Sequence, residues 1–185
     1  MIRSIALALC LLAPPATAAP EAWQLDAAAS SVGFTYELAN ADNRGTMPVA
    51  AADIRLDLRD ITASRVAVTL DTRGARAGFF LATQAMQGPQ VLDSARHPAI
   101  TFRSTAITGT PRAARIEGLL TARGVTRPVT LTAGLYRTPD TDPATLDSLT
   151  VLLTGAINRH DFGASGFSDL VGPMIGLRIV ARIER

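Results

Sequence analysis

The chain of 185 residues contains a single cysteine and no lysine, and only 5% of its residues are aromatic. The one cysteine, Cys10, lies near the amino terminus, so the rest of the chain has no disulfide, no thiolate metal ligand and no thiol nucleophile. A domain of this kind must be stabilised by its apolar core alone. No cluster of arginines is interleaved with aromatic residues, which argues against a nucleic-acid partner.

The sequence also lacks an apolar run of the ~20 residues that a membrane-spanning helix needs. The longest run, Ile5–Leu12, follows Arg3 and precedes the small residues Ala16–Ala18. This is the pattern of an export signal. We therefore predict a signal peptide at 1–18, cleavage near Ala18, and a periplasmic or secreted mature protein.

The remaining residues, 19–185, are predicted to form one domain, because we find no internal repeat and no low-complexity linker. With Arg3 removed, basic and acidic residues nearly balance, so no strongly basic face is expected. Cys10 lies inside the apolar run and follows Leu9, where a lipoprotein signal has a small residue. This argues against a lipid anchor.

From Trp23 onward the apolar residues recur with a period of two. Such alternation predicts antiparallel strands with one buried and one solvent-facing side. Turns or loops are expected at 39–45, 109–112 and 138–143, where Gly, Pro, Asn and Asp gather. The apolar members of the alternating segments are Ile54, Leu56 and Leu58; Val66, Val68 and Leu70; Ile100 and Phe102; Val129, Leu131, Ala133 and Leu135; Leu149, Val151 and Leu153; and Leu177, Ile179, Ala181 and Ile183.

Residues 78–93 depart from this period. Gly88 and Pro89 end an apolar run of roughly helical spacing, and Pro89 suits the first turn of a second short helix through Val91 and Leu92. We predict a short helical insertion here, between two strands. The apolar residues of the first run are Phe79, Phe80, Leu81, Ala82, Ala85 and Met86.

About eight such strands can close into a barrel with an interior suited to one ligand. A two-sheet β-sandwich with a solid core has the same sequence pattern. Periodicity alone leaves both architectures open.

Four segments, in order along the chain, resemble motifs of the YceI-like family. The members of that family are exported barrels related in shape to lipocalins. The resemblance covers essentially the whole mature domain and implies an all-β fold: an extended, lipocalin-like antiparallel β-barrel with the helical insertion around 78–93. It also implies binding of a long-chain isoprenoid lipid without chemistry on it. The matching segments are Trp23–Asp26 with Ser30, Val32 and Phe34; Ile100–Thr105; Gly118–Thr121 with Arg123–Val129; and Asn158–Gly163 with Val171 and Gly172.

Two positions depart from the family pattern. Ala29 stands where many members have a histidine before the serine of the first strand, and Ala82–Met86 stands where an Arg-Asp pair often precedes a leucine. The identity of the ligand head group is therefore left open. The apolar requirement of a prenyl tail is unaffected.

The aromatic residues, taken with the resemblance, predict an apolar tunnel for a prenyl tail. Arg159 is the candidate for holding the head group, because arginine forms charge-assisted hydrogen bonds to acceptors such as phosphate. Arg123 and Arg127 fit turn chemistry better. Taken singly, each tunnel candidate also suits an ordinary core position; the candidates are Phe34, Tyr36, Phe79, Phe80, Met86, Phe102 and Phe162.

The two histidines give weak signals. His160 precedes Asp161, and such a pair can support general-base catalysis. No nucleophile elbow of the Gly-x-Ser-x-Gly type accompanies them. His97 precedes Pro98, which favours an extended conformation at a strand entrance. We predict no metal site.

We therefore predict a periplasmic binding or carrier protein for a long-chain polyisoprenoid lipid, such as a quinone or a prenyl phosphate. It is expected to be no enzyme and to need no cofactor other than this lipid ligand. One alternative is a β-sandwich that serves as an interaction module for a respiratory membrane protein. Another, less favoured, is a hydrolase that uses His160 and Asp161. The oligomeric state is left open.

Overall fold

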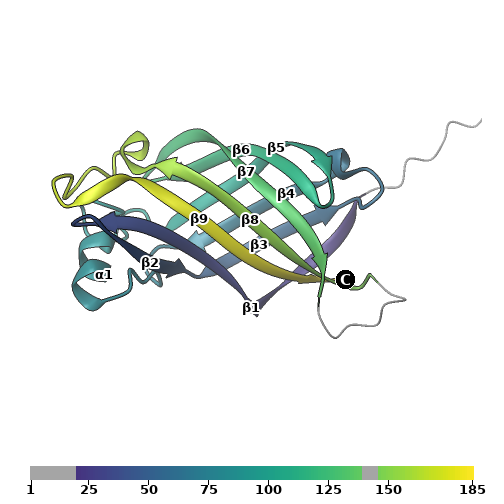
Figure 1. Ribbon diagram of the computed structural model, residues 1–185, viewed down its shortest axis with the longest axis horizontal. Helices are drawn as coiled ribbons and strands as arrows, with labels where there is room; N and C mark the ends of the chain where they lie inside the picture. The colour runs from purple at the N-terminus through teal and green to yellow at the C-terminus, as the bar shows by residue number, and fades with distance from the viewer. Residues whose placement is uncertain (1–19, 139–145) are drawn as a thin grey trace, which may run out of the picture.

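The computed structural model describes residues 20–138 and 146–185 (Figure 1). The signal peptide predicted at 1–18, with Cys10, and most of the loop expected at 138–143 lie outside these residues. In the described part, the strands are β1 (Glu21–Leu38), β2 (Ala41–Met47), β3 (Val49–Leu56), β4 (Arg65–Asp71), β5 (Ala99–Thr110), β6 (Ala113–Ala122), β7 (Val125–Arg137), β8 (Ser148–Asn158) and β9 (Val171–Glu184). The helices are α1 (Phe80–Gln87) and the short 3₁₀ helices η1 (Ile61–Ala63) and η2 (Arg159–Phe162).

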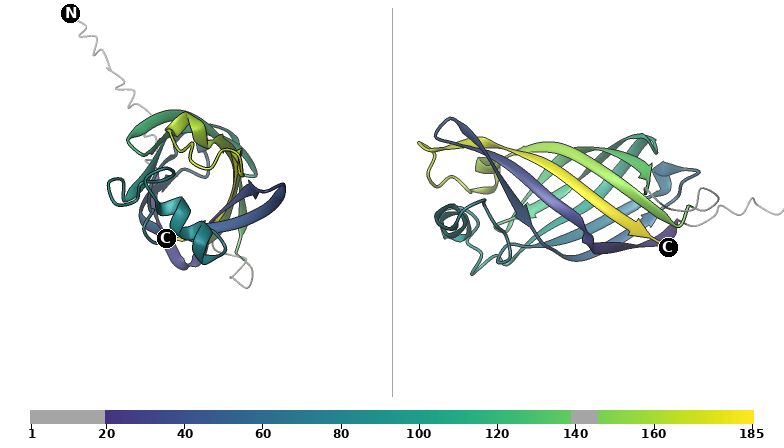
Figure 2. Two further views of the ribbon diagram at one scale, coloured as in Figure 1. Left: turned by 90° about the vertical axis from the view of Figure 1, so that its left-hand side faces the viewer. Right: turned by 60° about the horizontal axis from the view of Figure 1, so that its bottom comes forward.

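One antiparallel sheet curls until its ends meet. The order is β1-β3-β4-β5-β6-β7-β8-β9, and β9 pairs again with β1, which closes the ring (Figure 2). The predicted antiparallel β-barrel is therefore confirmed, and the β-sandwich alternative is wrong. Closure pairs both edges of the eight-stranded sheet, which would otherwise invite aggregation.

The alternation of the sequence sets the two faces of the wall. In β6 the buried residues Ala114, Ile116 and Leu120 face inward, while Arg115 and Glu117 are exposed on the outside. The same alternation in the other strands gathers apolar side chains inside the barrel. The apolar character of the interior thus follows from the apolar residues that recur at every second position along each strand.

The segment 39–45, expected to be a loop, is mostly strand. Only Ala39 and Asn40 form the turn, with φ values of 50° and 63°, as the central residues of a type I′ turn require. From Ala41 onward the chain pairs with β1, in a register that runs from Leu38–Ala41 to Val32–Met47. Long-range pairing has outweighed the turn-like composition of the segment, and the result is the extra strand β2 outside the closed ring.

A bulge in β1 bends that strand, which is visible as a sharp corner in Figure 1. Between Asp26 and Ser31 the register against β9 shifts, so β1 carries additional residues there. The Ser30 hydroxyl stabilises the bend, since it donates to the Asp26 carbonyl at 2.6 Å and accepts from the Arg182 amide at 2.9 Å. Beyond the bend, β1 exchanges its partner β3 for β2.

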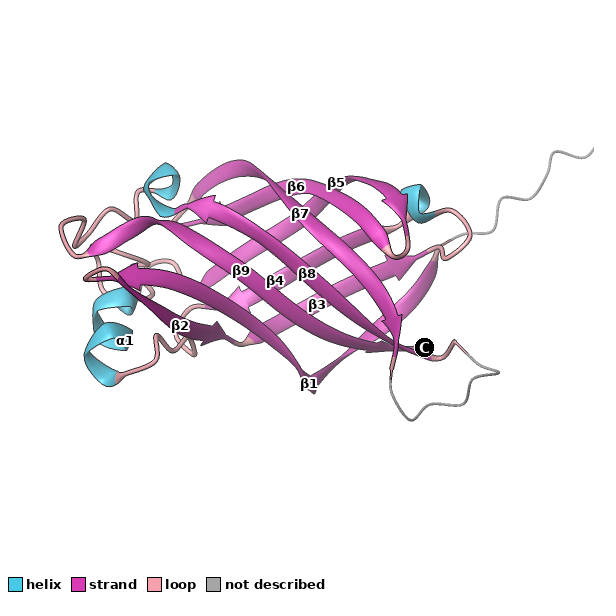
Figure 3. Ribbon diagram, in the orientation of Figure 1, coloured by secondary structure: helices cyan, strands magenta, loops and turns pink. Residues whose placement is uncertain are grey.

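Helix α1 lies across one end of the barrel, as Figure 3 shows. The predicted helical insertion is confirmed over Phe80–Gln87, but the second short helix expected through Val91 and Leu92 is wrong. After Gly88 the backbone folds back on itself, because the amides of Val91 and Asp93 both donate to the Gly88 carbonyl. In the described part of the chain, no helix combines the length and apolarity that crossing a membrane would require.

A buried apolar cluster fills the end of the barrel opposite α1. Ile183 is 0% exposed and Trp23 is 3% exposed. The guanidinium carbon of Arg185 lies 5.0 Å from the Trp23 ring centroid, so a cation covers this end of the core. The buried cluster consists of Trp23, Ile54, Leu56, Leu149 and Ile183.

We predict that Ile183→Ala lowers the free energy of unfolding by about 2–5 kcal/mol, because it removes a fully buried aliphatic side chain. Urea unfolding followed by Trp23 fluorescence measures this. The neighbouring exposed residue supplies the control, since Glu184→Ala should change stability by less than about 0.5 kcal/mol. Equal losses in the two variants would contradict the assigned inward and outward faces.

Candidate functional site

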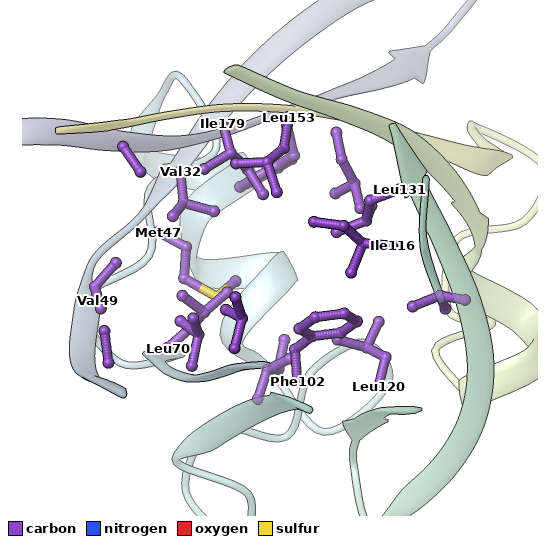
Figure 4. A pocket seen from close by; sticks show the side chains of 18 of the residues that line it. Val32, Met47, Val49, Leu70, Phe102, Ile116, Leu120, Leu131, Leu153 and Ile179 are labelled. Carbon is purple, nitrogen blue, oxygen red and sulfur yellow. The ribbon is translucent and has the colours of Figure 1, made fainter. Parts of the chain in front are cut away.

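The barrel encloses an apolar cavity of about 280 Å³ (Figure 4). Every strand of the closed ring contributes side chains to it, for example Leu70 from β4, Phe102 from β5 and Leu153 from β8. Among the described residues that line the cavity, only Ser30 and Arg159 have polar side chains. Because the Ser30 hydroxyl is already engaged by backbone groups, the lining offers little to a polar ligand group except at Arg159.

Glycines in the wall make room for two of the inward-facing phenylalanine rings. A Cβ atom at Gly118 would lie 2.5 Å from atoms of the Phe102 ring, and one at Gly45 would collide with the ring of Phe34. Both rings therefore rest against backbone. This close approach keeps bulky side chains near the wall and leaves the middle of the barrel open.

A second cavity, of about 250 Å³, lies beneath α1; we call it the vestibule. It is bounded by residues of β1, α1, the segment after η2, and β9. It adjoins the barrel cavity, because several residues line both, so the two apolar cavities follow one another from the interior to the α1 end. The shared residues are Phe34, Met86, Val91, Arg159 and Ile175.

Arg159 lies where the two cavities meet and is only 5% exposed. Its guanidinium donates to four backbone carbonyls: those of Ala164 and Gly166, between η2 and β9, and those of Val171 and Gly172, at the start of β9. It forms no ion pair with any carboxylate in the described part of the chain. Burial lowers the pKa of Arg159 from its ordinary value, since desolvation disfavours the charged form.

This arrangement gives Arg159 a structural role that the sequence did not indicate. The four hydrogen bonds hold residues 163–172 in a loop around the guanidinium. The charge itself has no counterion among the described residues. The site therefore presents one positive charge to an otherwise apolar space, which suits a ligand with a long apolar tail and a negative or electron-rich head group.

The structure places the other predicted tunnel residues in three locations. Phe34, Met86, Phe102 and Phe162 line the barrel cavity. Tyr36 and Phe79 line the vestibule, together with Phe34 and Met86. Phe80 lines neither cavity and is 72% exposed, so the expectation that it faces the tunnel does not hold.

The Tyr36 side chain is held in place by its hydroxyl, which donates to the Ala77 carbonyl at 2.7 Å. Burial raises the pKa of Tyr36, because the phenolate form would be desolvated. Tyr36 therefore stays neutral and anchors the segment before α1 to β1. Contact of these residues with a ligand stays a prediction.

The polar residues that the sequence singled out are mostly at the surface. His160 and Asp161 are exposed and line neither cavity. The His160 side chain forms no hydrogen bond within residues 20–138 and 146–185, so the hydrolase alternative gains no support from its surroundings. Over the same residues, no group of three or more His, Cys, Asp or Glu side chains is placed to hold a metal ion.

The two arginines of the β6–β7 hairpin tie it to its neighbours, and only Arg123 lies in the turn, since Arg127 belongs to β7. Arg123 and Gly124 form the turn, with φ values of 51° and 76°. The Arg123 guanidinium donates to the carbonyls of Pro89 and Val91, and the Arg127 guanidinium donates to the Asp161 carbonyl. These bonds connect the hairpin to the segment after α1 and to η2, and thereby brace the α1 end of the barrel.

Comparison with known proteins supports this architecture. Residues 23–183 match the family model described as the YceI-like domain. A curated protein named UPF0312 protein, from Pseudomonas aeruginosa, is 32% identical over 87 residues. That alignment covers 47% of this chain and 45% of the relative, so the chain spans less than half the length of the curated relatives it matches.

Solved structures share the fold at low sequence identity. Burkholderia cenocepacia BcnA has a TM-score of 0.75 and 18% identity, over 86% of this chain and 99% of that one. A polyisoprenoid binding domain from Saccharophagus degradans has a TM-score of 0.63 and 14% identity, over 88% and 97%. The Campylobacter jejuni YceI protein has a TM-score of 0.63 and 20% identity, over 73% and 80%.

We predict that Arg159→Gln lowers the free energy of unfolding by about 3 kcal/mol or more, because it leaves buried carbonyls without donors. Chemical denaturation measures the loss, and amide hydrogen exchange should rise within 163–172. Arg127→Gln is the control, since it removes one 3.2 Å bond at the surface and should have little effect. Similar stability of the two variants would refute the structural role of Arg159.

Proposed function

Because the chain belongs to the YceI-like family, we propose that it binds one long-chain polyisoprenoid lipid, with the tail in the barrel cavity and the head group near Arg159. The observation that carries this proposal is a pair of adjoining apolar cavities with one cation, Arg159, where they meet. In this role the protein acts as a periplasmic carrier or reservoir, exported by the signal predicted at 1–18. A respiratory membrane partner stays a prediction from the sequence.

The affinity for the tail comes from its removal from water. Burial contributes about 0.8 kcal/mol per methylene group. Association costs an estimated ~4–15 kcal/mol in lost freedom of motion. A few isoprene units therefore suffice for tight binding, and the methionines at the cavity, Met47 and Met86, adapt readily to a flexible tail.

The direction of the lipid follows from where the polar group lies. The end opposite α1 is closed by the buried cluster of Trp23, Leu149 and Ile183, and none of the described residues that line the cavity there is charged. Arg159 lies at the α1 end, at the boundary with the vestibule. The tail end therefore points toward Trp23 and the head group toward α1.

The same geometry favours an anionic head group over a neutral quinone. Backbone carbonyls already occupy four N–H groups of Arg159, which leaves it few donors for a ligand. Its main effect on a head group is then that of a charge without a counterion. A prenyl phosphate responds to that charge more strongly than a quinone does.

The proposed function includes no reaction of the lipid. In the described part of the chain, the two cavities contain no serine, cysteine or lysine nucleophile beside a histidine or carboxylate base. Of the two hydroxyl groups in the described linings, that of Ser30 is held in the bend of β1 and that of Tyr36 donates to the Ala77 carbonyl. Binding without turnover agrees with this chemistry.

We predict that the mature protein, purified without detergent from the cells that make it, carries lipid masses spaced by isoprene units. Native mass spectrometry followed by organic extraction measures this. Leu153→Trp should reduce the bound fraction at least about tenfold, because it fills the cavity, whereas the exposed neighbour variant Thr154→Trp should bind like the parent protein. Overpacking costs about 1–3 kcal/mol, so circular dichroism must first establish that both variants fold. An apo mass in the parent protein, with no uptake of added prenyl lipid, would refute the proposal.

We further predict that the protein binds a prenyl phosphate about tenfold or more tightly than the prenyl alcohol of equal length, owing to the charge of Arg159. Titration calorimetry of the two ligands measures the ratio. The difference should shrink with rising salt less than that of an exposed pair, since the charge is buried. Equal affinities would show that the head group does not lie near Arg159.

A further inference from the structure

The exposed large apolar side chains are unevenly distributed. Four of them line the vestibule and a fifth, Phe80, lies between two of these in α1, although α1 and the segment before β9 are far apart in the sequence (Figure 1). In the described part of the chain, the other exposed large apolar residues are Leu119, Tyr136, Leu146 and Met174, none of which lines the vestibule. We call the five residues the mouth patch: Phe79, Phe80, Leu81, Phe167 and Leu170.

Backbone contacts hold the two halves of the mouth patch together. The Gly166 amide donates to the Gln90 carbonyl at 2.9 Å, which joins the segment before β9 to the turn after α1. The Ala39 amide donates to the Leu170 carbonyl at 2.8 Å, which joins the same segment to the β1–β2 turn. These hydrogen bonds therefore fix the two halves of the mouth patch relative to each other.

The mouth patch is also the rim of the lipid path. Phe79, Leu81, Phe167 and Leu170 line the vestibule and are yet 47%, 69%, 45% and 56% exposed. Apolar residues thus line the barrel cavity, the vestibule and the outer surface beside it, with Arg159 as the one charged side chain of the two linings. A partner that covers the patch faces the open end of this path.

Helix α1 has the properties expected of a helix that contacts an apolar phase. None of its residues is buried, and its amino-terminal cap, Phe79, provides no side-chain hydrogen bond. Leu81 borders the vestibule, while Phe80 is 72% exposed and lines no cavity. Helices that are apolar on more than one side are normally found in a protein core or against lipid.

On the other side of the mouth, the backbone of Phe167 is strained. Phe167 has a φ of 58°, in the left-handed region that bulky residues avoid. The amides of Leu170 and Val171 both donate to its carbonyl, so a tight turn imposes this conformation. The strained turn holds an aromatic ring at the rim, where it stays 45% exposed.

We propose that the mouth patch docks on a phospholipid bilayer, so that the vestibule opens into the acyl-chain region. A protein partner or a second copy of the chain would cap the apolar path, whereas a bilayer extends it. The inference rests on the proposed function for its cargo: a prenyl tail that crossed water would lose the burial of every methylene group. Contact between mouth and bilayer removes that barrier.

The charges beside the mouth suit an anionic lipid surface on the α1 side. Arg44 and Arg76 lie beside the segment that enters α1, whereas Arg73 lies beside Gln87 at the other end of the helix. None of the three forms an ion pair with a carboxylate in the described ranges. Acidic residues Glu37 and Asp169 lie toward the β1–β2 turn and Leu170 instead. We therefore expect apolar insertion to dominate docking, with a moderate preference for anionic phospholipid.

Flotation with vesicles that contain no prenyl lipid tests docking by itself. With vesicles of phosphatidylethanolamine and phosphatidylglycerol, Phe80→Ser should reduce partitioning at least about tenfold. The matched control is Leu119→Ser, which removes an apolar side chain that is 44% exposed on β6, outside the patch; it should change partitioning less than about twofold. Because Phe80 lines no cavity, binding of soluble farnesyl phosphate should be the same in both variants.

A second measurement does not depend on loss of function. In Phe80→Trp, vesicles with brominated acyl chains should quench the new tryptophan, while the buried Trp23 at the opposite end stays unquenched as an internal reference. Absence of quenching, or no flotation of the parent protein, would overturn the proposal. So would a dimer that Phe80→Ser dissociates while vesicle binding is absent, which would assign the patch to a second copy. Flotation without farnesyl phosphate binding would uphold docking and count only against the proposed function.

Discussion

The pairing of β1 with β9 is the contact on which the rest of the structure depends. It runs from Gln24–Glu184 to Leu38–Val171, and it joins the two ends of the described chain. Without it the sheet would have two long edges and an apolar face open to water. With it, the same apolar face becomes the inner surface of a barrel. The protein has no disulfide in this domain, so the closure depends on backbone hydrogen bonds and buried aliphatic side chains.

The interior of a closed barrel can still be filled by the barrel's own side chains. Here Phe34 and Phe102 rest against Gly45 and Gly118, and the inner lining consists largely of aliphatic residues of moderate size. The remaining space is apolar and continues to the mouth beneath α1. Arg159, the one buried cation of residues 20–138 and 146–185, serves both parts of the molecule: it holds the segment before β9 in place and supplies the charge that a ligand would meet.

The sequence predicted the strands well, because a half-buried strand repeats every two residues and that period is visible in each segment. It predicted α1 from helical spacing, and it predicted that Arg123 lies in a turn, which proves to be the β6–β7 turn. It missed β2, since Asp42, Asn43 and Gly45 resemble a loop and only pairing with β1 makes them a strand. It also placed Phe80 in the tunnel, because helical spacing does not reveal which side of a short helix faces the protein.

By itself, then, the sequence determined an all-β domain with an apolar inner face, and the motifs that resemble the YceI-like family. Only the tertiary structure decided between a barrel and a sandwich, because strand alternation is the same in both and the difference lies in whether β1 meets β9. Only the structure showed that four carbonyls surround Arg159, and that α1 and Phe167 share one mouth. These contacts join residues far apart in the chain, and no local pattern in the sequence encodes them.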